Sequence, residues 1–87
     1  MGVTVLTEAP RLLSVVKASL EAGDAPAIAL AAHSLKGSAG YFGAEELKEL
    51  CRQIEAAADA RDLTKVGSQL PTLETAVAAA VANLAES

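Results

Sequence analysis

Glycine, proline and aspartate divide the 87-residue chain into four segments, and in each segment apolar residues recur at helical spacing. We therefore predict an all-α protein with helices over about 7–22, 24–41, 44–59 and 62–86. The last helix contains Pro71, which is expected to kink it or split it in two. Short connections between four amphipathic helices favour an antiparallel up-down four-helix bundle, with residues 1–87 forming a single domain.

The predicted helix boundaries rest on residues with known preferences. Thr7 followed by Pro10 is typical of a helix start, with Pro10 in the first turn. Gly23 is typical of the position just after a helix end. Asp24 and Asp62 are expected to cap the second and the last helix, because a carboxylate oxygen can accept a hydrogen bond from an unpaired backbone amide in the first turn.

The composition excludes several classes of protein. Seven basic against eleven acidic residues give a net charge of -4, which argues against a nucleic-acid binder. One cysteine and one histidine leave no internal disulfide and no structural zinc or other metal site. No apolar stretch is long enough to span a membrane. We expect a small acidic domain in the cytoplasm, and a covered core with net negative charge favours a monomer.

The second predicted helix has an unusual exposed face. On a helical wheel of about 100° per residue, the apolar residues expected in the core are Ile28, Ala31, Leu35, Ala39 and Phe42. The opposite side carries His33 among small or apolar residues, with one lysine: Pro26, Ala29, Leu30, Lys36, Gly37 and Gly40. A solvated face is usually rich in long charged side chains, so this face is unusually bare.

Three residues on this face predict phosphoryl chemistry. A neutral imidazole such as that of His33 is a nucleophile at cellular pH and can accept and release a phosphoryl group. Lys36 lies on the same side and can neutralise added negative charge. Gly37 costs about 0.5–1 kcal/mol of helix stability relative to alanine, which is understandable if another protein's backbone must approach His33. The alternative reading is an ordinary surface histidine, a solvated lysine and a glycine that packs against a neighbouring helix.

The stretch from Ala32 to Gly40, followed by Phe42-Gly43-Ala44, resembles the signature of histidine-containing phosphotransfer (HPt) domains. In that signature an apolar residue stands two positions after the histidine, then Lys-Gly, then a second glycine. The resemblance covers roughly residues 12–58, while the last helix agrees only as an amphipathic pattern. Family domains often carry an additional helix before the first one predicted here, and only about six residues precede it in this chain.

The resemblance implies a phosphorelay intermediate without ATP-binding or autokinase activity. His33 would accept a phosphoryl group from the aspartate of a receiver domain and pass it to another response regulator. Lys36 would stabilise the phosphate, and Gly37 would give clearance for docking. The implied docking surface is formed by Ala29, Leu30, Gly40 and Tyr41. No cofactor is implied for this chain, since the Mg²⁺ belongs to the receiver, and a sensor or hybrid histidine kinase would be the further partner.

Some points stay open at the level of sequence. Some family members have a glutamine in the third helix near the histidine, and either Gln53 or Glu55 could face the site here. A docking module that binds receivers without transfer is one alternative function. Another is the phosphoacceptor domain of a chemotaxis-type kinase, which shares a similar histidine motif and receives its phosphate from ATP through a kinase domain.

Overall fold

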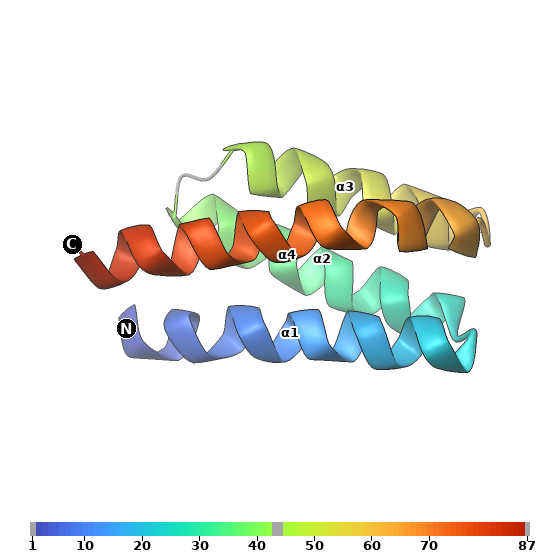
Figure 1. Ribbon diagram of the computed structural model, residues 1–87, viewed down its shortest axis with the longest axis horizontal. Helices are drawn as coiled ribbons and strands as arrows, with labels where there is room; N and C mark the ends of the chain where they lie inside the picture. Colours follow the sequence, from blue (N-terminus) through green and yellow to red (C-terminus); the bar gives the residue numbers. More distant parts are fainter. Residues whose placement is uncertain (1, 43–44, 87) are drawn as a thin grey trace.

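The computed structural model describes the backbone of residues 2–42 and 45–86, with side chains for 9–40 and 45–82, and the described backbone forms four α-helices. In chain order these are α1 (Gly2–Ala22), α2 (Ala25–Phe42), α3 (Glu45–Asp59) and α4 (Leu63–Glu86). Successive helices run in opposite directions, and α1 begins at the same end of the bundle at which α4 finishes (Figure 1). The predicted all-α, up-down four-helix bundle is confirmed.

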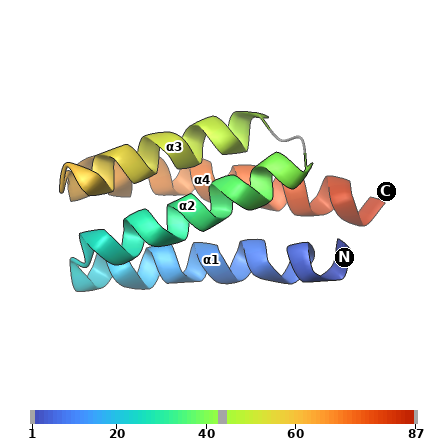
Figure 2. The same cartoon turned by 180° about the vertical axis from the view of Figure 1, so that it is seen from behind.

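Each helix packs against its two neighbours around the bundle. α2 lies between α1 and α3, and α4 closes the bundle by packing against α3 and α1. The view from behind brings α2 and α3 to the front, side by side (Figure 2). The edge between these two helices is therefore opposite the edge between α1 and α4.

The core consists of the residues that the apolar spacing predicts. The largest completely buried side chains come from all four helices: Val16, Ile28, Leu35, Leu47, Ile54, Val66 and Leu73. The side chain of Phe42, which the helical wheel assigns to the core, lies outside the described side chains. Cys51 is also completely buried, and burial raises the pKa of its thiol to about 11. Since only the thiolate is reactive, this thiol acts as a small apolar core residue.

The α1–α2 and α3–α4 connections are built in the same way. Gly23 and Arg61 both have positive φ, of 70° and 59°, just after a helix end. In each turn two amides bond back to the last helical turn: Gly23 to Leu20 and Asp24 to Ser19 at 3.1 and 2.8 Å, and Arg61 to Ala58 and Asp62 to Ala57 at 3.0 and 2.8 Å. These are paired Schellman bonds. The next residue then caps the following helix, as predicted: Asp24 Oδ1 accepts from the Ala27 amide and Asp62 Oδ1 from the Lys65 amide, both at 3.2 Å.

Two boundary predictions differ from the structure. α1 begins at Gly2 rather than at Thr7, and Pro10 lies inside it instead of in its first turn. Ala9 is completely buried, so the chain beside Pro10 is held against the bundle and the helix continues through the proline. α4 is continuous through Pro71 and is not split. Val66 and Leu73 are completely buried on either side of Pro71, so both halves of α4 are packed against the core.

Candidate functional site

The side chain of His33 stands on the outer side of α2. Ile28, Leu35 and Ala39 are completely buried on the inner side of the same helix, which fixes its rotation about its own axis. The wheel prediction is confirmed at this position, because 64% of the His33 side chain is exposed. The imidazole is thus accessible to a partner molecule, while the helix that carries it is held in place by the core.

A glutamate from the neighbouring helix α3 joins His33 and Lys36. Glu55 Oε1 accepts a hydrogen bond of 2.9 Å from Lys36 Nζ, and Oε2 lies 3.2 Å from His33 Nδ1. The second distance is at the long end of the range for an N–H···O bond. Lys36 and Glu55 are partly shielded, with 29% and 23% of their side chains exposed. The carboxylate is therefore held between two groups of α2.

The charge of Glu55 favours one arrangement of the imidazole. Its pKa is lowered from its ordinary value, first because it accepts the hydrogen bond from Lys36, while burial acts in the opposite direction. Glu55 is therefore a carboxylate at neutral pH and can only accept hydrogen bonds. A neutral imidazole beside it gains most with its proton on Nδ1, which leaves the lone pair on Nε2.

The small residues around His33 leave its surroundings open. A Cβ atom added to Gly37 or Gly40 would have no heavy atom within 4 Å, so neither glycine is required by packing against a neighbouring helix. Leu30 is 69% exposed, as predicted, whereas Ala29 is half-buried and packs against the core. The side chain of Tyr41 lies outside the described part of the molecule.

Of the two α3 residues that could face His33, Glu55 does so and Gln53 does not. Gln53 turns to the other side of α3, toward α4, where its Oε1 accepts a hydrogen bond of 2.7 Å from Gln69 Nε2. Its own amide donates to Glu49 Oε2 at 3.2 Å. Glu55 is the residue that meets His33 and Lys36, and the sequence alone could not distinguish it from Gln53.

Comparison with known protein families agrees with the four-helix fold. The sequence matches the family model of the Hpt domain over residues 3–86, which is nearly the whole chain. The chain belongs to the Hpt domain family. Hpt domains serve histidine phosphotransfer in two-component signalling, as phosphocarriers rather than as catalytic enzymes. No curated protein and no solved structure matches this Hpt domain in the corresponding searches.

In this Hpt domain the histidine lies on a convex helix surface and lines neither of two grooves that the described residues form. One groove, of about 410 Å³, lies between α3 and α4 and is lined by Glu45, Glu46, Glu49, Leu50, Gln53, Thr72 and Ala76. The other, of about 370 Å³, lies between α1 and α4 and is lined by Pro10, Leu13, Glu74, Val77, Ala78, Val81 and Ala82. Small-molecule sites are concave, so a convex site such as this one suits a protein partner.

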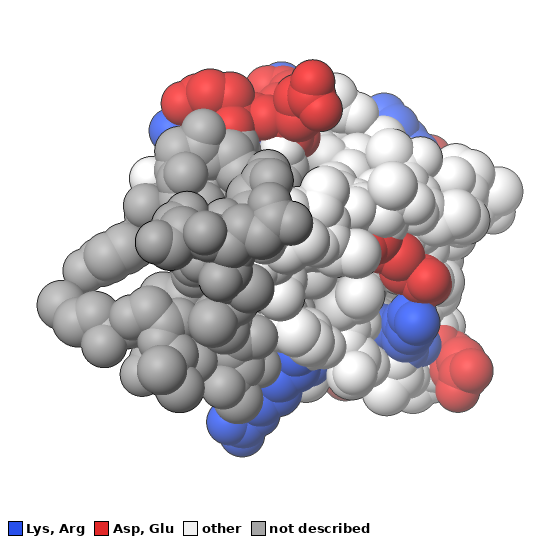
Figure 3. Space-filling model, turned by 60° about the vertical axis from the view of Figure 1, so that its left-hand side comes forward, with Lys and Arg blue, Asp and Glu red and all other residues white. Residues whose placement is uncertain are grey.

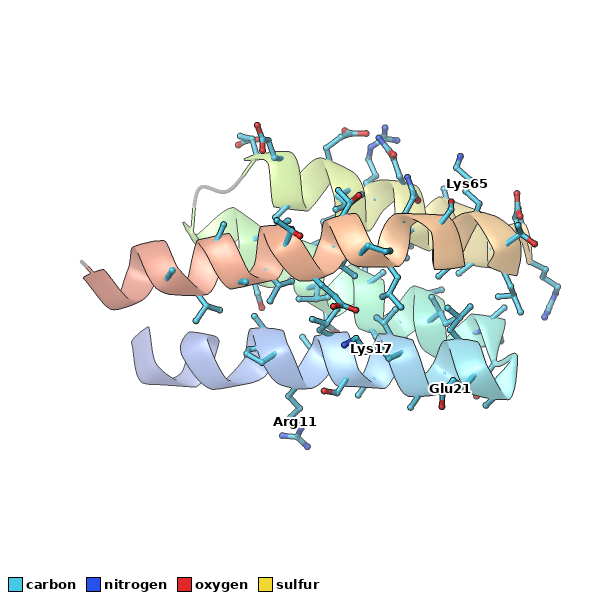
Figure 4. All side chains as sticks on the ribbon, viewed as in Figure 1. Arg11, Lys17, Glu21 and Lys65 are labelled. Carbon is cyan, nitrogen blue, oxygen red and sulfur yellow. The ribbon has the colours of Figure 1, made fainter. Side chains whose placement is uncertain are left out.

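The charged side chains of the Hpt domain are distributed in separate groups. On the described surface that Figure 3 shows, acidic and basic side chains lie side by side in small groups with uncharged surface between the groups, and the basic ones form no continuous area. Lys17 points toward α4, where its Nζ lies 3.1 Å from Glu74 Oε1, whereas Arg11 points away from the bundle (Figure 4). Among the described residues, no cluster of His, Cys, Asp or Glu side chains could hold a metal ion, and no helix could cross a membrane.

Proposed function

We propose that this Hpt domain is a phosphorelay intermediate in which His33 receives a phosphoryl group from a receiver aspartate and passes it to a second response regulator. The observation that carries the proposal is the exposed imidazole whose Nδ1 lies 3.2 Å from a carboxylate. Nε2 attacks the phosphorus of the aspartyl phosphate, a P–N bond forms, and the receiver carboxylate leaves with the electrons of the broken P–O bond. The reverse reaction with another receiver regenerates the free imidazole.

The neighbours of His33 have supporting roles in this proposal. Lys36 supplies a positive charge one turn away from the incoming phosphoryl group, although in the unphosphorylated chain it is bonded to Glu55. Gly37 leaves room for the receiver backbone. Ala29, Leu30, Gly40 and Tyr41 form the docking surface for the receiver, which would bring the magnesium ion with it.

We further propose that the chain neither binds ATP nor phosphorylates itself. The α3–α4 groove carries three glutamates at its rim, and neither groove is lined by a lysine or arginine that could neutralise a triphosphate. The phosphoryl group must then come from a partner, with a sensor or hybrid histidine kinase at the start of the relay. We expect the domain to act as a monomer in the cytoplasm, where receiver domains are found.

The decisive experiment is a phosphotransfer assay with receiver domains labelled on aspartate. We expect acid-labile, alkali-stable label on the wild-type chain and none on His33→Gln, with unchanged helicity by circular dichroism. Lys36→Ala should slow the transfer roughly tenfold, which corresponds to about 1.4 kcal/mol. Lys17→Ala removes another interhelical ion pair, remote from His33, and should leave the rate unchanged.

The same assay separates the alternatives. Label on His33→Gln would show that His33 is not the phosphoacceptor. Binding of receivers without transfer in either direction would indicate a docking module. Phosphorylation by a separate ATP-dependent kinase, with no exchange from receivers, would indicate the phosphoacceptor domain of a chemotaxis-type kinase.

A further inference from the structure

We propose that the groove between α3 and α4 binds a basic amphipathic helix of a partner protein and leaves His33 uncovered. The inference goes beyond the proposed function and does not depend on it. A partner bound in this groove holds the Hpt domain in place while the imidazole stays accessible to a receiver.

The groove has an apolar floor and an acidic rim. Its volume is about 410 Å³, and its floor contains Leu50 of α3 and Ala76 of α4, which are half-buried and pack against the core. Glu45, Glu46 and Glu49 line its α3 side. A ligand that matches both parts carries an apolar stripe with positive charges beside it.

Two of the three glutamates have no cationic partner among the described side chains. Glu49 is paired with Arg52, and the other described ion pairs lie away from the groove. Glu45 and Glu46 occupy the first turn of α3, where acidic residues favour the positive end of a helix. Both remain exposed, so their carboxylates are available to the cations of a partner.

A chain of hydrogen bonds fixes one wall of the groove. Gln69 Nε2 donates to Gln53 Oε1 at 2.7 Å, and Gln53 Nε2 donates to Glu49 Oε2 at 3.2 Å. Arg52 pairs with the same carboxylate. The side chains of Gln53 and Glu49 are therefore held in place before a partner arrives, which lowers the entropic cost of binding.

The backbone beside the groove favours a helical partner. α3 and α4 are both helical along the lining residues, so their amides and carbonyls bond within each helix. An extended peptide would find no strand edge here, and its own backbone would lie unpaired against Leu50 and Ala76. A helix has a paired backbone and can place a row of apolar side chains along the groove.

A second copy of this chain does not supply the matching charges. Three of its seven basic residues are paired with its own glutamates. The other four come from α1, α3, the α3–α4 turn and α4, so none of the described helices presents two unpaired cations: Arg11, Lys48, Arg61 and Lys65. The complementary helix must therefore belong to another protein.

The groove and His33 lie on different sides of α3. Gln53 lines the groove, whereas Glu55 contacts His33, and the two α3 residues are about 200° apart around the helix axis. None of the described lining residues belongs to α2. In the view from behind, α2 and α3 are in front and α4 lies behind them (Figure 2). A helix in the groove therefore leaves the imidazole accessible.

The test uses the full chain and a synthetic peptide whose leucines recur at helical spacing with lysines on both sides of the leucine stripe. A second peptide carries glutamate in place of every lysine. We expect the lysine peptide to bind, measured by fluorescence anisotropy, and the glutamate peptide not to bind. Binding should weaken as salt is raised above about 0.1 M, because salt screens exposed charges. In NMR spectra the methyl signals of Leu50 and Ala76 should shift, and the ring signals of His33 should not.

A pair of tryptophan variants locates the peptide. Thr72 is exposed and lines the groove, so Thr72→Trp should fill the groove and abolish binding. Thr64 is an exposed residue of the same helix outside the groove, and Thr64→Trp should bind as the wild type does. Circular dichroism checks that both variants keep the helicity of the wild type.

A pair of double variants tests the charges. Glu45→Gln with Glu46→Gln should lower the affinity for the lysine peptide about three- to tenfold, the effect of two exposed ion pairs. Glu21→Gln with Asp59→Asn removes two exposed charges elsewhere and should change the affinity less than about twofold.

Several results would overturn the inference. Equal affinity for the two peptides, unchanged binding in Thr72→Trp, or a shift of the His33 ring signals would each contradict it. Spermine that binds as tightly as the lysine peptide would show an acidic cluster without a helix site. A concentration-dependent dimer that Thr72→Trp dissociates would assign the groove to a second copy. Failure of the proposed function appears differently, as no transfer between His33 and any receiver, and does not affect peptide binding.

Discussion

Lys36 Nζ donates a hydrogen bond of 2.9 Å to Glu55 Oε1, so the cation beside His33 is already attached to α3 before any phosphoryl group arrives. The same carboxylate lies 3.2 Å from the imidazole of His33. His33 and Lys36 of the α2 signature are therefore linked through a residue outside it. Changes at Glu55 are expected to affect both the lysine and the histidine.

This link predicts how the stability of the bundle depends on pH. The pKa of Glu55 in the folded chain lies below its ordinary value of 4.5, chiefly through the hydrogen bond from Lys36. Its contribution to stability is thus complete above that value and is lost as the pH falls through the lower, folded value. We expect the free energy of unfolding to fall on acidification, and to fall less in Lys36→Ala. Urea unfolding at neutral and acidic pH measures the effect, and equal pH dependence in both chains would contradict it.

Substitutions at Gly37 are expected to affect the stability of α2 and the access of a receiver to His33 in different ways. Gly37→Ala is expected to stabilise the bundle by up to about 1 kcal/mol, because the new Cβ meets no atom within 4 Å. Gly37→Leu should remain folded but block transfer from a receiver. Ala18→Leu, which adds a leucine to the exposed side of α1, serves as the control and should transfer normally. If Gly37→Leu unfolds the chain, the glycine is needed for packing.

Two leucines of α2 should respond in opposite ways. Leu35 is completely buried, and Leu35→Ala should lower the free energy of unfolding by about 2–5 kcal/mol. Leu30 is 69% exposed, so Leu30→Ala should change stability by less than about 0.5 kcal/mol. The same Leu30 change should weaken receiver binding, measured by titration calorimetry. Unchanged binding would remove Leu30 from the docking surface.

The α3–α4 turn contains a residue with an unfavourable backbone conformation. Arg61 has φ of 59°, in the same structural position that glycine occupies in the α1–α2 turn. A side chain in this region costs about 1–2 kcal/mol, partly offset by the greater flexibility of glycine in the unfolded chain. We expect Arg61→Gly to stabilise the bundle by about 0.5–1 kcal/mol in thermal unfolding. Gly23→Ala should destabilise it, and a loss of stability in Arg61→Gly would refute the argument.

Much of the fold could be predicted because its signals are local. Gly23, Asp24 and Asp62 end or begin helices through hydrogen bonds within a few residues, and each was assigned correctly. Thr7 and Pro10 gave a wrong start for α1, because both residue types also occur inside helices where tertiary packing holds the chain. The same applies to Pro71, which does not split α4.

The site was predictable only on the helix that carries the motif. His33 and Lys36 share one face of α2, and a helical wheel places them together. Gln53 and Glu55 flank Ile54 on opposite sides of α3, each about 100° from it. Which of them meets His33 depends on whether α2 or α4 lies on that side, and hence on the handedness of the bundle. Helical spacing within one segment does not determine handedness.

The thiol of Cys51 is protected from oxidants by its burial in the core. With a pKa of about 11, roughly one thiol in ten thousand is ionised at neutral pH, and the sulfur is completely buried. It is the only cysteine of the chain, so peroxide or a disulfide reagent finds almost no thiolate to attack while the bundle is folded. The proposed phosphoryl transfer through His33 should therefore not be interrupted by oxidation of this thiol.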